Sequence, residues 1–154
     1  MRLTSGMFSS NTPEYETPNE LYNALDSEFG FTVDVCAQSH NAKCPYYFTP
    51  NDDGLKQDWS KHICWMNPPY GQEIVKWVKK AYLESLRGSL VVALLPARTD
   101  TRWWHEFVME ADEIRLIKGR VRFVGYGPAP FPSCIVIWGI SSYSDKPKVI
   151  SWRQ

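Results

Sequence analysis

Apolar residues gather in three continuous runs, which predict buried strands of a sheet. The runs cover residues 63–66, 89–95 and 134–139. Unbroken apolar runs of this length are typical of strands that are covered on both faces. Pro68 and Pro96 end the first two runs, because proline cannot donate a hydrogen bond to a neighbouring strand. A shorter stretch, residues 31–37, predicts another strand that ends in small residues.

Three stretches with apolar residues at helical spacing alternate with these strands. They begin after Thr17, after Gly71 and after Thr101. The first starts with the capping box Thr17–Glu20, has Pro18 at its first helical position, and ends at Gly30. Strands that alternate with helices predict an α/β fold with a three-layer α/β/α arrangement.

Residues 113–124 predict two strands about the turn at Lys118 and Gly119, and a Gly/Pro-rich loop follows at 125–132. Residues 114–144 contain no acid, and the basic residues among them are Arg115, Lys118, Arg120 and Arg122. Such a charge distribution suits a face that meets phosphates, and it suits a solvated hairpin equally well. Both interpretations stay open at this point.

A chain of 154 residues with 44% hydrophobic residues is long enough for one domain with a sizeable core. We expect a loose leader over residues 1–13 and a single domain over 14–154. The segment 38–63 is too short for a full helix–strand–helix crossover. The first half of the sheet is therefore expected to be abridged.

Composition excludes several classes of protein. No apolar span of 18 residues and no secretion signal is visible, so we expect no membrane segment and a cytoplasmic protein. The four cysteines form no Cys-x-x-Cys pair, which favours buried thiols over a zinc site, and no metal is expected. The formal net charge is zero and gives no general indication of a nucleic-acid partner.

The stretch Asn67-Pro68-Pro69-Tyr70 follows the strand at 63–66, at the edge of an α/β sheet where ligands bind. It resembles the catalytic motif of methyltransferases that modify amino groups with S-adenosylmethionine. The side-chain carbonyl of Asn67 and the backbone carbonyl of Pro68 can hold both hydrogens of an aromatic amine and turn its lone pair toward a methyl donor. Pro69 stiffens the turn, and Tyr70 offers a face for an extruded base. Asn-Pro and Pro-Pro are also ordinary turn formers.

Together with other stretches, this motif resembles the phage-type, Dam-like DNA N-6-adenine methyltransferases over about Glu14 to Trp138. The resemblance rests on an ordered set of segments: 15–18, 31–37, 41–44, 47–49, 53–55, 58–59, 67–71, 95–101 and 130–133. It implies a Rossmann-like sheet and transfer of a methyl group from S-adenosylmethionine to the exocyclic amine of adenine in double-stranded DNA. Phage or prophage DNA modification in a bacterial host is the implied setting.

The resemblance also implies roles for individual residues. Asn67, Pro68, Pro69 and Tyr70 would form the catalytic motif. The cofactor would be bound by Thr17 and Pro18 at its methionine end, by Asp34, Cys36 and Ala37 at the first strand, and by Asp58 and Trp59 at its adenine. DNA would be contacted by Arg98, Arg102, Arg120 and Arg122.

Two features depart from the family pattern: the glycine-rich turn is absent, and no clear acid follows a second strand to bind the ribose. Asp52 or Asp53 is our expectation for that acid. Two other functions stay open on the sequence alone. The acceptor could be RNA adenine or protein glutamine, whose amino groups pose the same chemical problem. The chain could also be a DNA-binding relative without activity.

Overall fold

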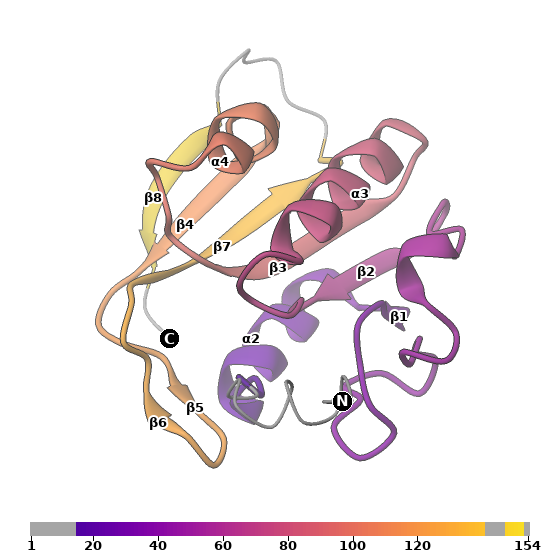
Figure 1. Ribbon diagram of the computed structural model, residues 1–154, viewed down its shortest axis with the longest axis horizontal. Coiled ribbons are helices and arrows are strands. Elements are labelled where there is room, and N and C mark those ends of the chain that lie inside the picture. Colours follow the sequence, from indigo (N-terminus) through magenta and orange to yellow (C-terminus); the bar gives the residue numbers. More distant parts are fainter. Residues whose placement is uncertain (1–14, 141–146, 153–154) are drawn as a thin grey trace, which may run out of the picture.

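A computed structural model describes residues 15–140 and 147–152, so the expected leader at 1–13 lies outside the described residues. Within them, six strands form one mixed sheet in the order β1-β2-β3-β7-β4-β8. The strands are β1 (Val33–Asp34), β2 (Ile63–Met66), β3 (Leu90–Pro96), β7 (Ser133–Trp138), β4 (Glu113–Ile117) and β8 (Lys148–Trp152). Strand β7 runs antiparallel to both of its neighbours, whereas β1, β2 and β3 are parallel and so are β4 and β8 (Figure 1). The predicted α/β class is confirmed.

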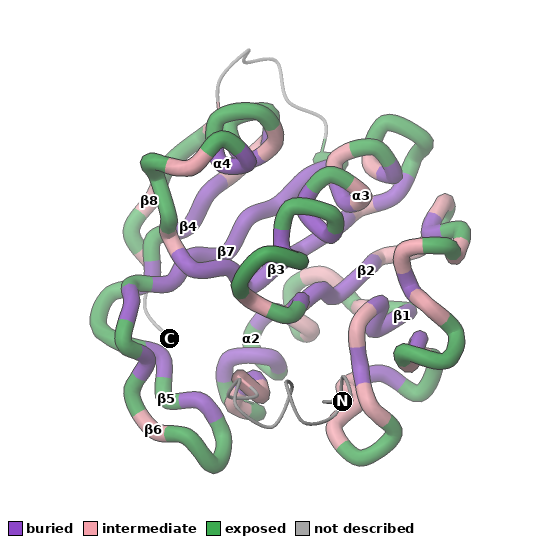
Figure 2. Tube along the Cα trace, in the orientation of Figure 1, coloured by how far each residue is buried: buried purple, intermediate pink, exposed green. Residues whose placement is uncertain are grey.

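The three apolar runs form the centre of this sheet. Strands β2, β3 and β7 are buried almost throughout, as Figure 2 shows. Alternate side chains of a strand point to opposite faces, so Cys64 and Met66 join one apolar cluster while Trp65 joins the other. Burial on both faces explains why these runs lack polar residues.

Three α-helices cover the sheet in the described part of the chain: α2 (Asn19–Phe29), α3 (Ile74–Leu86) and α4 (Arg102–Phe107). Helices α3 and α4 pack into the cluster that contains Cys64 and Met66. Helix α2 packs through Leu21, Tyr22 and Leu25 into the cluster on the other face. None of the described helices is long and apolar enough to cross a membrane. All four cysteines are free thiols, and only Cys36 is partly exposed.

Local signals at the helix ends were predicted with mixed success. Gly30 ends α2 with a φ of 70°, and the Thr101 side chain accepts from the Trp104 backbone N–H at the start of α4, both as expected. The capping box at Thr17 is wrong, because α2 begins at Asn19 after Pro18 and has no side-chain cap. The Thr17 hydroxyl has a different partner, described below.

The two strands predicted within 113–124 are present as β4 and β5 (Arg122–Phe123), but they do not pair with each other. Strand β4 pairs with β7 and β8, not with the residues after Gly119. Instead β5 pairs with β6 (Gly127–Pro128) in a separate two-stranded sheet. We call residues 118–132 the basic ribbon; this segment leaves the main sheet after β4 and returns to it at β7 (Figure 1).

The segment between β1 and β2 is mostly irregular. Strand β1 is only two residues long, and Tyr46–Phe48 contributes a single bridge, between Asp34 and Tyr47, instead of a strand. A short 3-10 helix, η1 (Gly54–Lys56), follows. This segment wraps around the carboxyl end of β1, where it helps to enclose a cavity.

Candidate active site

A cavity of about 460 Å³ opens at the carboxyl ends of β1 and β2. This volume is within the usual range for small-molecule sites. Four stretches line it: Tyr15–Thr17; residues between Asp34 and Lys43; residues between Thr49 and Leu55; and residues between Trp65 and Trp77. The structure therefore brings Thr17, Asp34, Cys36, Ala37 and the whole Asn67–Tyr70 motif to one site.

Asn67 is fixed by the segment Tyr15–Thr17. Its Nδ2 donates to the Tyr15 carbonyl oxygen at 2.6 Å and to the Thr17 hydroxyl at 3.0 Å. Its Oδ1 is buried and has no hydrogen-bond partner among the described residues. A buried acceptor without a partner is rare in folded proteins. The amide thus keeps one acceptor that no donor of the described residues occupies.

Tyr70 lies flat within a group of aromatic side chains. Its ring stacks on Tyr15 with centroids 5.2 Å apart, and the rings of Phe123 and Phe131 meet it edge-on. Its hydroxyl donates to the Leu94 carbonyl oxygen at 3.1 Å. Desolvation raises the pKa of Tyr70 well above its usual value, so this hydroxyl stays a neutral donor. The ring plane is therefore held from both its edge and its face.

Asp34 organises the wall of the cavity next to β1. Its carboxylate accepts from the backbone N–H groups of Cys36, at 3.2 Å, and Lys43, at 3.0 Å. Burial raises the pKa of Asp34 to about 6, although these hydrogen bonds oppose the shift. The carboxylate holds the turn at Cys36 and Ala37, which has no glycine, in place.

Asp58 and Trp59 do not line the cavity. Trp59 is fully buried; its indole N–H donates to the Gly54 carbonyl oxygen at 2.8 Å and its backbone N–H donates to Glu84. Asp58 is exposed, lies 3.9 Å from Arg87 and accepts from the Ser60 backbone. The pair supports the loop behind the cavity wall and is remote from its surface.

The wall in front of Trp59 consists of Asp53, Gly54 and Leu55, of which only Asp53 was proposed from the sequence as a site residue. Gly54 packs so closely that a Cβ atom there would lie 2.2 Å from the Val35 carbonyl oxygen. Asp53 lines the cavity, whereas Asp52 turns back to Thr49. Of the two acids expected near the ribose, Asp53 is therefore the one at the site.

Lys43 and Glu16 place opposite charges on the cavity wall, and sequence reasoning missed both. The Lys43 Nζ lies 3.7 Å from the Glu16 carboxylate and donates to the Asn19 side chain at 2.9 Å. The Lys43 side chain is only 10% exposed, so its charge is held at the site. The signal was available, because Lys43 is the single basic residue between residues 11 and 53.

The four predicted DNA-binding arginines lie outside the cavity lining. Arg98 stacks over Phe131 at 5.7 Å, beside the aromatic group around Tyr70. Arg102 is exposed and pairs with Glu106 on its own helix. Arg120 and Arg122 belong to the basic ribbon, and Arg122 is exposed in β5. Pro18 also stays outside the lining, at the start of α2.

The basic ribbon reaches the cavity through residues 15 and 16. Glu16 forms an antiparallel bridge with Val124, whose N–H donates to the Glu16 carbonyl oxygen at 3.0 Å. The Tyr15 ring contacts Phe123 and Tyr126 of the ribbon at centroid distances of 5.0 Å. Arg115, in contrast, is buried in an ion pair with Glu28 and Glu113 and takes no part in a basic surface.

Comparison with known proteins gives consistent matches. The sequence model of a family described as DNA N-6-adenine-methyltransferase (Dam) matches residues 5–129. A DNA N-6-adenine-methyltransferase of Haemophilus phage HP1 is 34% identical over 128 residues, which are 80% of this chain and 73% of that protein. A protein of the same name from Escherichia phage T1 is 32% identical over 113 residues, 68% of this chain and 47% of that protein. A putative methyltransferase of Escherichia coli K12, YfdM, is 33% identical over 64 residues, 37% of this chain and 70% of that protein.

Proposed function

Because the chain belongs to the DNA N-6-adenine-methyltransferase (Dam) family, we propose that it transfers a methyl group from S-adenosylmethionine to the exocyclic amine of adenine in DNA. One observation carries the chemistry: Asn67 presents a buried, unpartnered Oδ1 beside Pro68 and Tyr70 in a cavity of suitable size. Such an acceptor gains a full hydrogen bond when an amine reaches it.

The residues of the motif act on the adenine. The amine is a weak nucleophile because its lone pair is delocalised into the ring. The Asn67 Oδ1 and the Pro68 carbonyl oxygen accept its two hydrogens and turn the lone pair out of the ring plane. Tyr70 holds the extruded base by stacking, with its own ring fixed by the hydrogen bond to Leu94. Catalysis then rests on positioning and fixed dipoles.

The cavity suits the cofactor in both charge and shape. S-adenosylmethionine supplies an electrophilic methyl group on a positively charged sulfur. Lys43 and Glu16 can hold the carboxylate and the ammonium of its amino-acid end, since they place both charges on one wall. The turn at Cys36 and Ala37, held by Asp34, lies beside them, and Asp53 is the acid for the ribose hydroxyls.

The cofactor site that we propose differs from the sequence expectation at three residues. Pro18 is the N-cap of α2, Trp59 holds the Gly54 carbonyl oxygen from behind, and Asp58 lies beside Arg87, so we assign these three to the frame of the site. Thr17 remains at the cavity wall. The lack of a glycine-rich turn is offset by the buried Asp34, which fixes the backbone at the equivalent place.

We propose that the sheet is the Rossmann-like, three-layer sheet of S-adenosylmethionine-dependent methyltransferases, abridged in its first half. Helices on both faces and the edge position of β1 support this arrangement. We also propose that residues 14–154 act as one methyltransferase domain. In this proposal DNA lies against the cavity mouth, where Arg98, Arg102 and the basic ribbon with Arg120 and Arg122 meet its phosphates.

The test is transfer of labelled methyl groups to duplex DNA by wild-type protein and by Asn67→Ala. We expect the variant to lose at least about 100-fold in kcat, because the acceptor for the amine is removed. Its affinity for S-adenosylmethionine, measured by calorimetry, should stay within about threefold, since Asn67 acts on the base. Asn23→Ala, on the exposed side of α2, is the matched control. Unchanged turnover in Asn67→Ala, or wild-type transfer to RNA or protein instead of DNA, would contradict the proposal.

A further inference from the structure

We propose that the segment Tyr15–Thr17 belongs to the catalytic machinery, with Thr17 as the positioning residue that orients the Asn67 amide. This inference rests on the proposed function, in which Asn67 accepts from the adenine amine. It gives the Thr17 hydroxyl a role toward Asn67, whereas the sequence indicated a role toward a helix end or the cofactor.

The amide has one orientation that satisfies its neighbours. Both hydrogens of Nδ2 are used, one by the Tyr15 carbonyl oxygen and one by the Thr17 hydroxyl. If the amide turned over, its Oδ1 would face the Tyr15 carbonyl, which lies 2.6 Å from the present Nδ2. Two acceptors at that distance share no proton. The arrangement therefore leaves Oδ1, and not Nδ2, for the substrate.

The Thr17 hydroxyl is available for Asn67 because it does not cap helix α2. The sequence Thr17–Glu20 has the form of a capping box, yet the cap of α2 is Pro18 and no side chain caps the helix. Thr17 is only 2% exposed, so water does not compete for its hydroxyl. Its hydrogen bond to Asn67 is thus made in a buried place, where the lower local dielectric strengthens it.

The position of the segment is itself fixed by the basic ribbon. Glu16, between the two residues that hold Asn67, is bridged to Val124. The Tyr15 ring packs against both Tyr70 and Phe123, which also contact each other. One short stretch of backbone thereby links the ribbon, the stacking tyrosine and the catalytic amide.

Thr17→Val tests the role, because valine has nearly the same shape but accepts no hydrogen bond. We expect kcat for DNA methylation to fall about 10- to 100-fold, as one amide hydrogen loses its partner. The Kd for S-adenosylmethionine should stay within about threefold, and Thr17→Ser should recover kcat to within about threefold of wild type. Thr32→Val also loses a hydroxyl, at the other end of the strands, and should leave kcat unchanged.

A second readout does not need activity. The side-chain amide protons of Asn67, assigned in NMR spectra by their loss in Asn67→Ala, should be protected from exchange in wild type and in Thr17→Ser. They should lose protection in Thr17→Val. Thr17→Ala should give the same result and serves as the test if valine disturbs folding.

The outcomes separate the two proposals. Unprotected wild-type amide protons, a loss confined to cofactor affinity, or a Thr17→Ser variant as slow as Thr17→Val would each overturn the positioning role. Wild-type protein that transfers no methyl group to DNA would overturn the proposed function, even where the Asn67 protons are protected as expected.

Discussion

Asn67 holds a buried acceptor that has no partner in the described part of the chain, at a cost to the free energy of folding of about 1 to 3 kcal/mol. Selection for stability alone would remove such an atom, for example by a smaller apolar residue. The rest of the amide, however, is well satisfied by Tyr15 and Thr17. One orphan atom in an otherwise satisfied side chain is the pattern expected of a site that is complete only with its substrate.

Asp34 gives a pH-dependent prediction at the same scale. Burial raises its pKa to about 6, so the carboxylate becomes neutral as pH falls from about 7 to about 5. Its attraction for the positive sulfur of S-adenosylmethionine is then lost. Calorimetric affinity for S-adenosylmethionine should therefore weaken over this range, and more than affinity for S-adenosylhomocysteine, whose sulfur is uncharged. In Asp34→Asn this difference between the two ligands should not change with pH; a persistent change would exclude Asp34 as its source.

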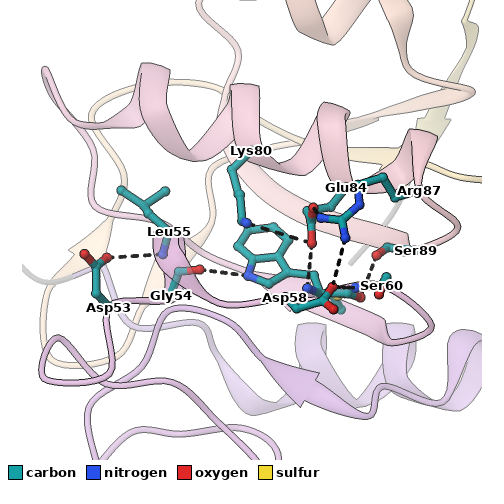
Figure 3. A network of polar contacts seen from close by, with 11 residues as sticks. Asp53, Gly54, Leu55, Asp58, Ser60, Lys80, Glu84, Arg87 and Ser89 are labelled. Carbon is teal, nitrogen blue, oxygen red and sulfur yellow. Dashed lines mark hydrogen bonds and ion pairs between the residues drawn. The ribbon is translucent and has the colours of Figure 1, made fainter.

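At the scale of elements, a buried network stiffens the irregular segment between β1 and β2. Glu84 of α3 is 2% exposed; it accepts from the Trp59 backbone and pairs with Lys80 and Arg87 (Figure 3). Trp59 in turn holds the Gly54 carbonyl. Helix α3 thereby supports a cavity wall that has almost no regular secondary structure of its own.

Gly54→Ala should expose this dependence. The new Cβ would meet the Val35 carbonyl oxygen at 2.2 Å and the Trp77 ring at 3.0 Å, so backbone must move. We expect a loss of about 2 to 4 kcal/mol in the free energy of unfolding, measured with urea. Gly30→Ala is the comparison, since Gly30 has a positive φ of 70° but no atom within 4 Å; it should cost about 1 kcal/mol. Equal losses in the two variants would mean that the wall yields easily.

At the scale of the whole molecule, basic and acidic residues are equal in number but gather in different parts of the chain. The chain has 17 basic and 17 acidic residues, and the acids dominate residues 11–53, around the cavity. Arg115 forms an ion pair with Glu28, and this contact lowers the pKa of the Glu28 carboxyl group. We expect the basic residues that meet DNA to be those of the basic ribbon together with Arg98.

Salt dependence of DNA binding measures that division. Replacing Arg120 and Arg122 by alanine should reduce the slope of log K against log salt by about one for each phosphate that the protein no longer neutralises. Lys148→Ala, in the edge strand β8, is the control and should leave the slope unchanged. If the double variant keeps the wild-type slope, the ribbon is a solvated surface and DNA is held elsewhere.

The sequence predicted those parts of the fold that burial alone decides. Strands β2, β3 and β7 and helix α3 follow from apolar spacing, because each buries a face in the core. Pairing partners were harder: the ribbon and β8 depend on contacts between distant segments that no local pattern records. The capping role predicted for Thr17 was wrong for the same reason, since its partner Asn67 is 50 residues away.

The sequence predicted some residues of the candidate site and missed others. Motif residues next to predicted strand ends, such as Asn67 and Asp34, do lie at the cavity. Asp58 and Trp59 do not, because an indole beside a strand has the same sequence pattern whether it packs on a ligand or in the core. Lys43 was missed because a single lysine in a loop carries no spacing signal, although its surroundings are acidic.

The reversed direction of β7 has a consequence for how such an enzyme diversifies. Since Ser133 pairs with Pro96, and Cys134 with Leu116, β7 begins at the rim where β3 and β4 finish. The chain between β4 and β7 therefore leaves and rejoins the scaffold at neighbouring points on the substrate side. The basic ribbon inserted there can be lengthened, shortened or exchanged while the strands of the main sheet keep their register. New preferences for the target sequence can therefore evolve without a change in the catalytic residues.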